Sequence, residues 1–153
     1  MIYRPYTPPD FDPLYSIEEA SFEAASRFSR RYMRQLVSRS NAATWIAEES
    51  GKICGFAIVE WLRDLGGVSG YIQTIEVSPD QRRRGIGSEL IRRVEASATA
   101  AKSESIRLHV DEENAAAIRL YESHGYSREG REEDYYPSGH AAWMYAKQLD
   151  AAE

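Results

Sequence analysis

The stretch that decides the fold is Gln81-Arg82-Arg83-Arg84-Gly85-Ile86-Gly87-Ser88. It follows a β-rich run that ends at Val77, and it opens a segment over residues 86–100 whose apolar residues recur at helical spacing. Glycine lets backbone amides face a ligand without obstruction by Cβ, and the first turn of a helix carries partial positive charge. The stretch therefore predicts a strand–turn–helix unit suited to an anion such as a diphosphate.

Two familiar phosphate-binding motifs do not fit this turn. A Walker loop requires Gly-Lys-Ser/Thr, and a dinucleotide fingerprint would require a third glycine where Leu90 stands. The simplest alternative for the stretch taken alone is a solvated basic turn before an ordinary helix, because runs of arginine are often only surface charge.

Composition places the chain among ordinary globular proteins. With 153 residues, 42% apolar and 28% charged, it is expected to form one domain over residues 1–153. A formal net charge of −5 argues against a nucleic-acid binder. The single cysteine, Cys54, excludes a disulfide framework and a cysteine-based zinc site, and three scattered histidines suggest no metal site. The longest apolar run, residues 53–59, is too short to cross a membrane, and no signal region is apparent, so we expect a soluble cytoplasmic protein.

Residue patterning along the chain predicts an α/β fold with a mixed, mostly antiparallel sheet and helices on both faces. The strands before and after the helix over 86–100 are expected to be parallel, because that helix provides a crossover. Strands are predicted at residues 2–6, 43–48, 52–63, 70–77, 105–110, 126–135 and 141–148. Helices are predicted within residues 11–38, with a break near 25–28, and at 86–100 and 114–124.

The glycine-rich turn occurs together with two further motifs. Ile75-Glu76-Val77-Ser78-Pro79 precedes the Arg82-x-x-Gly85-x-Gly87 pattern. His109-Val110 is followed by Asn114-Ala115-Ala116-Ala117-Ile118-Arg119-Leu120-Tyr121-Glu122. In this combination, residues from about 71 to 144 resemble the GNAT superfamily of acyl-CoA-dependent N-acetyltransferases. The late Tyr135-Tyr136-Pro137 segment and the strand with Met144 are most similar to protein N-terminal acetyltransferases, including the ribosomal-protein-alanine type.

The resemblance implies that acetyl-CoA is the cosubstrate and coenzyme A a product, held where two central parallel strands splay apart. It implies main-chain pairing of the strand end with the pantetheine arm, a diphosphate site at the start of the helix, and an oxyanion donor at the Val77 N–H. The residues expected to contact the cofactor are Ile75, Glu76, Val77, Arg82, Arg83, Arg84, Gly85, Ile86, Gly87, Ser88, Asn114 and Tyr121.

Three residues are candidates for proton transfer. In Ile106-Arg107-Leu108-His109-Val110, alternation places His109 on the face opposite the apolar residues, and a histidine of ordinary pKa, about 6.5, can accept a proton near pH 7. The ribosomal-protein-alanine enzymes carry a glutamate here, whereas another N-terminal subgroup has histidine with a tyrosine on the preceding strand. We therefore infer a Tyr71/His109 pair that acts directly or through water. The resemblance assigns Tyr121 as the acid toward the coenzyme A sulfur. The alternatives are a structural histidine and ordinary packing tyrosines.

The acceptor amine is expected between Phe22-Glu23 and Tyr135-Tyr136. An α-amine, with a pKa of about 7.7–8.0, loses its proton more easily than a lysine amine near 10.4, which favours a protein N-terminus. The acidic turn common in the related enzymes is replaced here by Ser138-Gly139-His140-Ala141-Ala142. Two alternatives stay open: an enzyme acting on a small amine such as a polyamine, antibiotic or amino acid, and a non-catalytic acyl-CoA-binding module. The protein is expected to be a monomer or homodimer.

The remaining histidines and the acidic run are expected to have other roles. His124 is expected to cap a helix end, and His140 to lie in an exposed loop or at the rim of the substrate site. Asp111-Glu112-Glu113 is expected to start the following helix with favourable charge.

Overall fold

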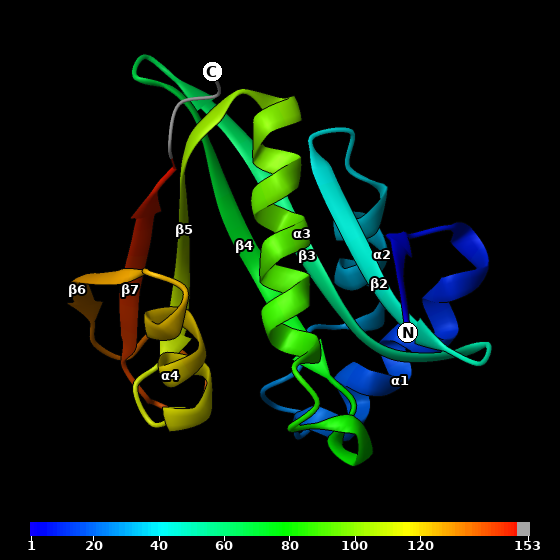
Figure 1. Ribbon diagram of the computed structural model, residues 1–153. Helices are drawn as coiled ribbons and strands as arrows, with labels where there is room; N and C mark the ends of the chain where they lie inside the picture. The colour runs from blue at the N-terminus through cyan, green and yellow to red at the C-terminus, as the bar shows by residue number, and fades with distance from the viewer. Residues whose placement is uncertain (150–153) are drawn as a thin grey trace.

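One sheet, with strand order β1-β2-β3-β4-β5-β7-β6, forms the frame of the molecule (Figure 1). The computed structural model describes residues 1–149, so the last part of the predicted domain, 150–153, lies outside the described residues. The strands are β1 (Ile2–Pro5), β2 (Ala42–Glu49), β3 (Lys52–Asp64), β4 (Gly67–Val77), β5 (Ser103–Asp111), β6 (Ser127–Glu132) and β7 (Ala142–Gln148). The helices are α1 (Phe11–Ser21), α2 (Arg30–Ser38), α3 (Ile86–Ala101) and α4 (Ala115–Ser123). No helix of the described chain is long and apolar enough to cross a membrane.

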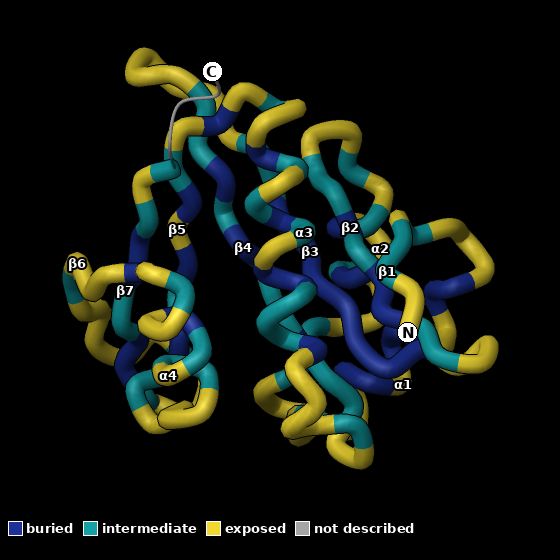
Figure 2. Tube along the Cα trace, in the orientation of Figure 1, coloured by how far each residue is buried: buried dark blue, intermediate teal, exposed yellow. Residues whose placement is uncertain are grey.

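Helices cover both faces of the sheet, as predicted. α3 lies across one face, and its Leu90, Val94 and Ala98 are buried in a cluster with residues of β3, β4 and β5 (Figures 1 and 2). α1 and α2 cover the opposite face, where Leu14 and Met33 join a second cluster with residues of β2 and β3. Burial of apolar side chains at about 25 cal/mol per Å² makes these two layers the main source of stability.

The central strands β4 and β5 form the only parallel pair among the described strands. Their pairing runs from Val68 with Ser103 to Ile72 with Leu108, and then it stops. β4 nevertheless continues to Val77 and β5 to Asp111. The two strands therefore splay apart over their C-terminal parts, as the family resemblance implied, and Figure 1 shows the gap widening toward α4 and the start of α3.

Two predicted boundaries are corrected by the structure. The strand expected over 126–135 ends at Glu132, because the chain then turns through Asp134, which has a left-handed φ of 54°. Residues Tyr135 and Tyr136 consequently lie in the β6–β7 loop, where their N–H groups donate to the carbonyl of His140 at 3.1 and 3.2 Å. The strand expected over 70–77 begins earlier, because β4 already starts at Gly67, whose φ is 115°.

Candidate active site

The start of α3 provides the predicted anion site. Gly85 is the N-cap residue and has a left-handed φ of 77°, a conformation that costs an L-residue with a side chain free energy. The first N–H groups of a helix have no partner within it, so those at Ile86, Gly87 and Ser88 are available to an anion. Arg83, just before the cap, also has a positive φ of 66°.

Gly87 has a different role from Gly85. Its backbone is not left-handed, but a Cβ added there would lie 3.1 Å from Cδ2 of Leu120 on α4. The missing side chain therefore allows the start of α3 to approach α4 closely. Both glycines were expected to leave the backbone amides open to a ligand. The structure shows that Gly85 provides the left-handed turn, whereas Gly87 allows α3 and α4 to pack closely.

A pocket of about 690 Å³ joins the start of α3 to the splayed end of β4 and to α4. Most of the residues predicted to contact the cofactor line it, together with Phe22 from the acceptor prediction. The lining residues are Ser21, Phe22, Ile75, Glu76, Val77, Gln81, Arg82, Arg83, Gly85, Ile86, Gly87, Ser88, Asn114, Ala116, Ala117 and Leu120.

The three arginines of the turn do not behave alike. Arg82 and Arg83 line the pocket, and Nε of Arg82 donates to the Val77 carbonyl at 3.3 Å. The guanidinium of Arg84 instead forms an ion pair with Glu49 on β2 at 2.6 Å. The side chain of Arg84 is therefore occupied by the protein itself, and the two arginines before it have the freedom to meet phosphate oxygens.

Other residues at the pocket serve the helix ends. Asn114 is the N-cap of α4, where its Oδ1 accepts from the Ala117 N–H at 3.1 Å while the residue lines the pocket. His124 is the C-cap of α4, as predicted, and its Nε2 lies 2.9 Å from Oγ of Ser88.

Tyr71 on β4 and His109 on β5 are in contact at the point where the pairing of the two strands ends. The Tyr71 hydroxyl lies 2.6 Å from Nδ1 of His109, and Nε2 of that ring lies 3.1 Å from Oε1 of Glu132. The ring of Tyr135 stacks on His109 at 4.5 Å between centroids, and the ring of Tyr136 lies 4.9 Å from that of Tyr135. Burial, followed by a hydrogen bond with Tyr135, raises the pKa of Tyr71, so its hydroxyl is protonated at neutral pH. The structure thus brings two predicted catalytic residues beside two predicted acceptor residues.

Tyr121 is buried on α4 and, unlike its neighbour in sequence Leu120, is not among the residues that line the pocket. Burial, and then the nearby charge of Glu76, raise the pKa of Tyr121 far above its usual value. The phenol therefore keeps its proton at neutral pH.

Phe22 and Glu23, the other two residues predicted to contact the acceptor, have different surroundings at the end of α1. Phe22 lines the pocket, with 39% of its surface exposed. Glu23 is exposed in the α1–α2 loop, where its carbonyl accepts from the N–H groups of Ser26 and Arg27. Phe22 thus meets the pocket directly, whereas Glu23 shapes the loop.

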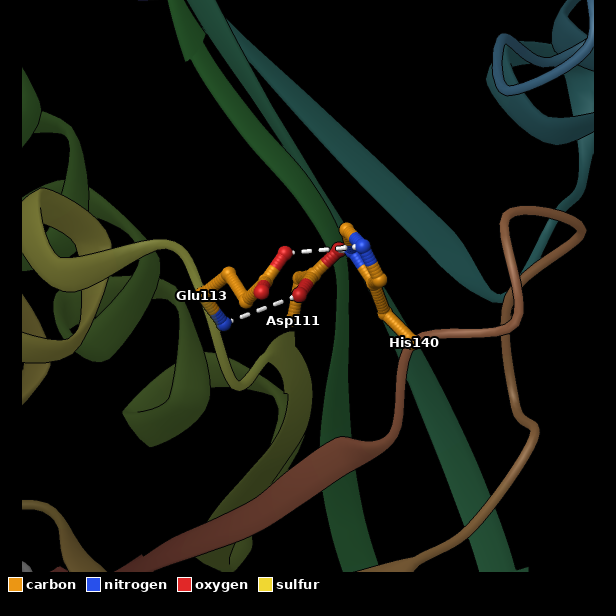
Figure 3. Close-up of side chains that lie close together, drawn as sticks. All are labelled: Asp111, Glu113 and His140. Carbon is orange, nitrogen blue, oxygen red and sulfur yellow. Dashed lines mark hydrogen bonds and ion pairs between the residues drawn. The ribbon is translucent and has the colours of Figure 1, made fainter.

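His140 has a role that its sequence context did not reveal. Figure 3 shows the carboxylates of Asp111 and Glu113 on the same side of its ring, with Nδ1 2.9 Å from Oδ2 of Asp111 and Nε2 2.7 Å from Oε2 of Glu113. The acidic run was expected to start a helix, but α4 begins only at Ala115. Because the His140 carbonyl also accepts from Tyr135 and Tyr136, the histidine fastens the β6–β7 loop to the end of β5.

Two further groups were missed in the sequence. Glu132 gave no signal, because its contact with His109 depends on how β6 and β7 fold back beside β5. Glu18 and the side chain of Glu76 are buried carboxyl groups, 1% and 5% exposed, that face each other from α1 and β4. Glu76 was predicted only for its main chain.

Two known proteins are similar in sequence to part of this chain. [Ribosomal protein bS18]-alanine N-acetyltransferase of Escherichia coli K12 is 32% identical over 90 residues, which cover 59% of this chain and 58% of the relative. Mycothiol acetyltransferase of Thermobispora bispora is 32% identical over 93 residues, 57% of this chain and 30% of the relative. The match therefore spans less than two thirds of the length of either relative.

Solved structures agree over almost the whole chain. The crystal structure of the ribosomal-protein-S18-alanine N-acetyltransferase from Escherichia coli has a TM-score of 0.86 at 25% identity, covering 99% of this chain and 96% of that one. Arabidopsis thaliana NAA60 in complex with a bisubstrate analogue has a TM-score of 0.85 at 21% identity, covering 99% of each chain, and supports the fold alone.

The family model described as acetyltransferase (GNAT) family matches residues 11–126. This range contains the glycine-rich turn, the splayed strands and α4, so the match confirms the resemblance and the acetyltransferase class predicted from the motifs. The chain belongs to the acetyltransferase (GNAT) family.

Proposed function

We propose that the protein transfers the acetyl group of acetyl-CoA to the N-terminal α-amine of a protein or peptide. The observation that carries this proposal is the Tyr71–His109 contact of 2.6 Å on the strands that splay apart beside the anion site. This contact supports a proton-accepting pair on the strands between which the thioester arm is proposed to lie.

In this proposal, positively charged groups at the start of α3 and unpaired peptide groups at the end of β4 hold the cosubstrate. The diphosphate lies against the first amides of α3 and the guanidinium groups of Arg82 and Arg83, where helix dipole and side-chain charge act together. The pantetheine amides pair with the main chain of residues 75–77, which no longer pairs with β5. These residues suit the predicted ligand because they line the pocket and their peptide groups are not paired with β5.

The transfer needs three groups. The amine nitrogen attacks the thioester carbonyl, and its proton passes to the Tyr71–His109 pair. The N–H of Val77 donates to the developing oxyanion, which is where electrostatic stabilisation contributes most. The C–S bond then breaks, and Tyr121 donates its proton to the departing thiolate, yielding the acetylated amine and coenzyme A. The pair then releases the proton of the amine to water and Tyr121 regains one from water, which restores both groups.

An α-amine fits this base better than a lysine side chain. Its pKa of about 7.7–8.0 leaves a substantial neutral fraction at working pH, whereas a lysine amine near 10.4 does not. Aromatic side chains in the β6–β7 loop and Phe22 at the end of α1 bound the acceptor side. Acetylation of a small amine is the second candidate, favoured by the 32% identity over 93 residues to a relative named for mycothiol rather than for a protein.

The test is release of free thiol from acetyl-CoA by the purified chain. One panel contains peptides that differ in their first residue, and the other contains polyamines, free amino acids and aminoglycosides. Turnover confined to peptides supports the proposal, and turnover confined to the small amines replaces it with the second candidate. Binding of coenzyme A without turnover of any amine leaves a non-catalytic acyl-CoA-binding module. The cytoplasmic location and the choice between monomer and homodimer stay predictions.

A further inference from the structure

A histidine at the C-terminal end of α4 reaches the start of α3. Nε2 of His124 lies 2.9 Å from Oγ of Ser88. Ser88 lines the pocket and is the third residue of α3, so its N–H is one of those without a partner inside the helix. His124 is not itself among the residues that line the pocket. It can therefore act on a bound anion through the Ser88 hydroxyl and through its own charge.

An anion in the pocket determines the direction of this hydrogen bond. A serine hydroxyl donates one hydrogen bond and accepts others, whereas the ionised diphosphate of coenzyme A only accepts. A Ser88 hydroxyl that faces a phosphate oxygen must therefore donate to it. Because the hydroxyl has only one proton to donate, the contact with His124 must then run from Nε2–H to Oγ. The imidazole thereby holds the hydroxyl with its proton directed toward the pocket.

The end of α4 does not require the imidazole. The backbone N–H of His124 donates to the Tyr121 carbonyl at 3.0 Å, and that of Gly125, whose φ is 87°, donates to the Glu122 carbonyl at 3.1 Å. These hydrogen bonds come from the main chain and would form with another side chain at position 124. The contact of the ring with α3 is therefore separate from the capping of α4.

The charged groups that face His124 come from α3 and β7. Arg92 and Glu95 lie on α3, and Lys147 lies on β7. Arg92 pairs with Glu89 at 3.1 Å and Lys147 pairs with Glu95 at 2.9 Å, so both cations have a partner of opposite charge. Burial, and then the charge of Arg92, lower the pKa of His124 below its usual value of 6.5, so the ring is mostly neutral at pH 7. A negative charge bound in the pocket favours protonation of the ring.

We propose that His124 is a positioning residue for the cosubstrate: it holds the Ser88 hydroxyl as a donor to the diphosphate, and it takes up a proton from solvent at Nδ1 when coenzyme A binds. The inference rests on the proposed position of the diphosphate at the start of α3, and not on which amine is acetylated. Linkage is reciprocal, so a ligand that favours the protonated ring binds more tightly to the protonated protein. The affinity for coenzyme A should therefore rise as the pH falls from 8 toward 5.5.

Calorimetric titration with coenzyme A between pH 5.5 and 8 tests this inference. His124→Gln is the informative variant, because an amide can donate to Ser88 but does not gain a proton. At pH 8 its Kd should lie within about twofold of the wild-type value, since both proteins then present a neutral donor. At pH 5.5 the wild type should bind about fivefold more tightly than the variant, which corresponds to about 1 kcal/mol between opposite charges. Titration of the ligand's own phosphate is common to both proteins and cancels in the ratio.

Proton uptake provides a second readout of the same titration. Measurements in buffers that differ in ionisation enthalpy give the number of protons bound together with coenzyme A. Near pH 6 the wild type should take up more protons than His124→Gln. A ratio of the two Kd values that stays constant from pH 5.5 to 8, with equal proton uptake in both proteins, overturns the inference but leaves the proposed function. Failure of the folded wild-type chain to bind coenzyme A at any pH overturns both.

Serine variants separate the contact with α3 from an effect on the end of α4. Ser88→Ala should raise the Kd for coenzyme A about fivefold at pH 8, as for the loss of one hydrogen bond. His124→Leu should have a similar effect, and the double variant should be little worse than either, because the two side chains act through one contact. Ser123→Ala is the matched control, since its hydroxyl donates to the Leu120 carbonyl within α4 at 2.7 Å. Its Kd should equal that of the wild type.

A merely structural role for His124 gives a different result. His124→Leu would then lower the Tm in thermal unfolding but leave the Kd of the folded protein unchanged. That outcome overturns the inference. Rescue by glutamine at pH 8 but not at pH 5.5, with no rescue by leucine at either pH, supports it, because only the imidazole combines a donor with a proton-accepting nitrogen.

Discussion

The Tyr71 hydroxyl lies 2.6 Å from Nδ1 of His109, and Nε2 of the same ring lies 3.1 Å from Oε1 of Glu132. A carboxylate oxygen only accepts hydrogen bonds, so the contact with Glu132 favours the tautomer with the proton on Nε2, in which Nδ1 accepts from the Tyr71 hydroxyl. The lone pair of the histidine is therefore covered by the tyrosine. In the proposed reaction, a proton from the acceptor amine would reach the ring through the Tyr71 oxygen, and Glu132 would orient the imidazole as the carboxylate of a catalytic triad does.

Substitution of the pair tests this route. Tyr71→Phe and His109→Gln should each lower kcat about 100-fold, the lower end of what a positioned proton acceptor contributes, without changing the affinity for coenzyme A. The double variant should be little worse than either single one, because residues that act as a unit are not additive. Steady-state kinetics and calorimetric titration with coenzyme A provide the two readouts.

Tyr126→Phe is the matched control for the tyrosine. It also removes a buried hydroxyl, which donates to Glu95 at 3.0 Å, but it lies beyond α4. Its kcat should be close to that of the wild type. Full activity of folded His109→Gln would exclude the ring from the reaction.

Substitution of Arg83 and of Arg84 should affect the Kd for coenzyme A differently, because the two side chains have different contacts. Arg83→Ala removes a cation that lines the pocket, and we expect the Kd for coenzyme A to rise about tenfold, as for the loss of a hydrogen bond between charged groups. Arg84→Ala breaks an exposed ion pair with Glu49, so the Kd should change less than twofold. Titration at two salt concentrations measures both values. Equal losses in the two variants would show that Arg84 leaves Glu49 to contact the ligand.

The contacts of His140 with Asp111 and Glu113, which we call the His140 clasp, should stabilise the protein to an extent that depends on pH. Its hydrogen bond with Asp111, together with the negative charges of Asp111, Glu113 and Glu112, raises the pKa of His140 above its usual value of 6.5. A histidine whose pKa is raised by folding stabilises the protein fully below its unfolded pKa, and this contribution disappears as pH rises through the folded value. The difference in Tm between wild type and His140→Asn should therefore be largest near pH 6 and shrink toward pH 9.

Other titrating groups cancel in this comparison, because they are common to the two proteins. Asp111→Asn should reduce the pH dependence of the difference, since it removes the first partner of the histidine. The KM for peptide should rise in His140→Asn more than the KM for acetyl-CoA, because the histidine fastens the loop that carries Tyr135 and Tyr136. A Tm difference that is constant between pH 6 and 9 would contradict the clasp.

Gly85 should tolerate asparagine better than alanine. A Cβ at this position meets nothing within 4 Å, so the cost lies in the left-handed backbone, about 1–2 kcal/mol for alanine. Asparagine adopts that conformation more readily. Urea unfolding should place the midpoint of Gly85→Asn between those of the wild type and Gly85→Ala. Equal midpoints for the two variants would mean that the turn relaxes to another conformation.

The element order was predictable because local patterns carry it. The change from alternating residues before Val77 to helical spacing after Gly85 marks a β–α junction in any tertiary context. The end of β6 was less predictable, since Tyr135 and Tyr136 are strong strand formers that leave the sheet after the turn at Asp134 and donate to the His140 carbonyl instead. The turn and the hydrogen bonds of the loop override strand preference at that point.

The sequence by itself determined the family and predicted an anion site and the candidate pair Tyr71 and His109, because glycine, arginine and alternating residues act over short stretches of chain. Only the tertiary structure decided which carboxylates matter. Glu132 meets His109, and Glu18 meets Glu76, through contacts between elements distant in sequence. A carboxyl group's burial and partner depend on how helices and strands pack, and these surroundings determine whether it orients a base, shares a proton or remains solvated at the surface.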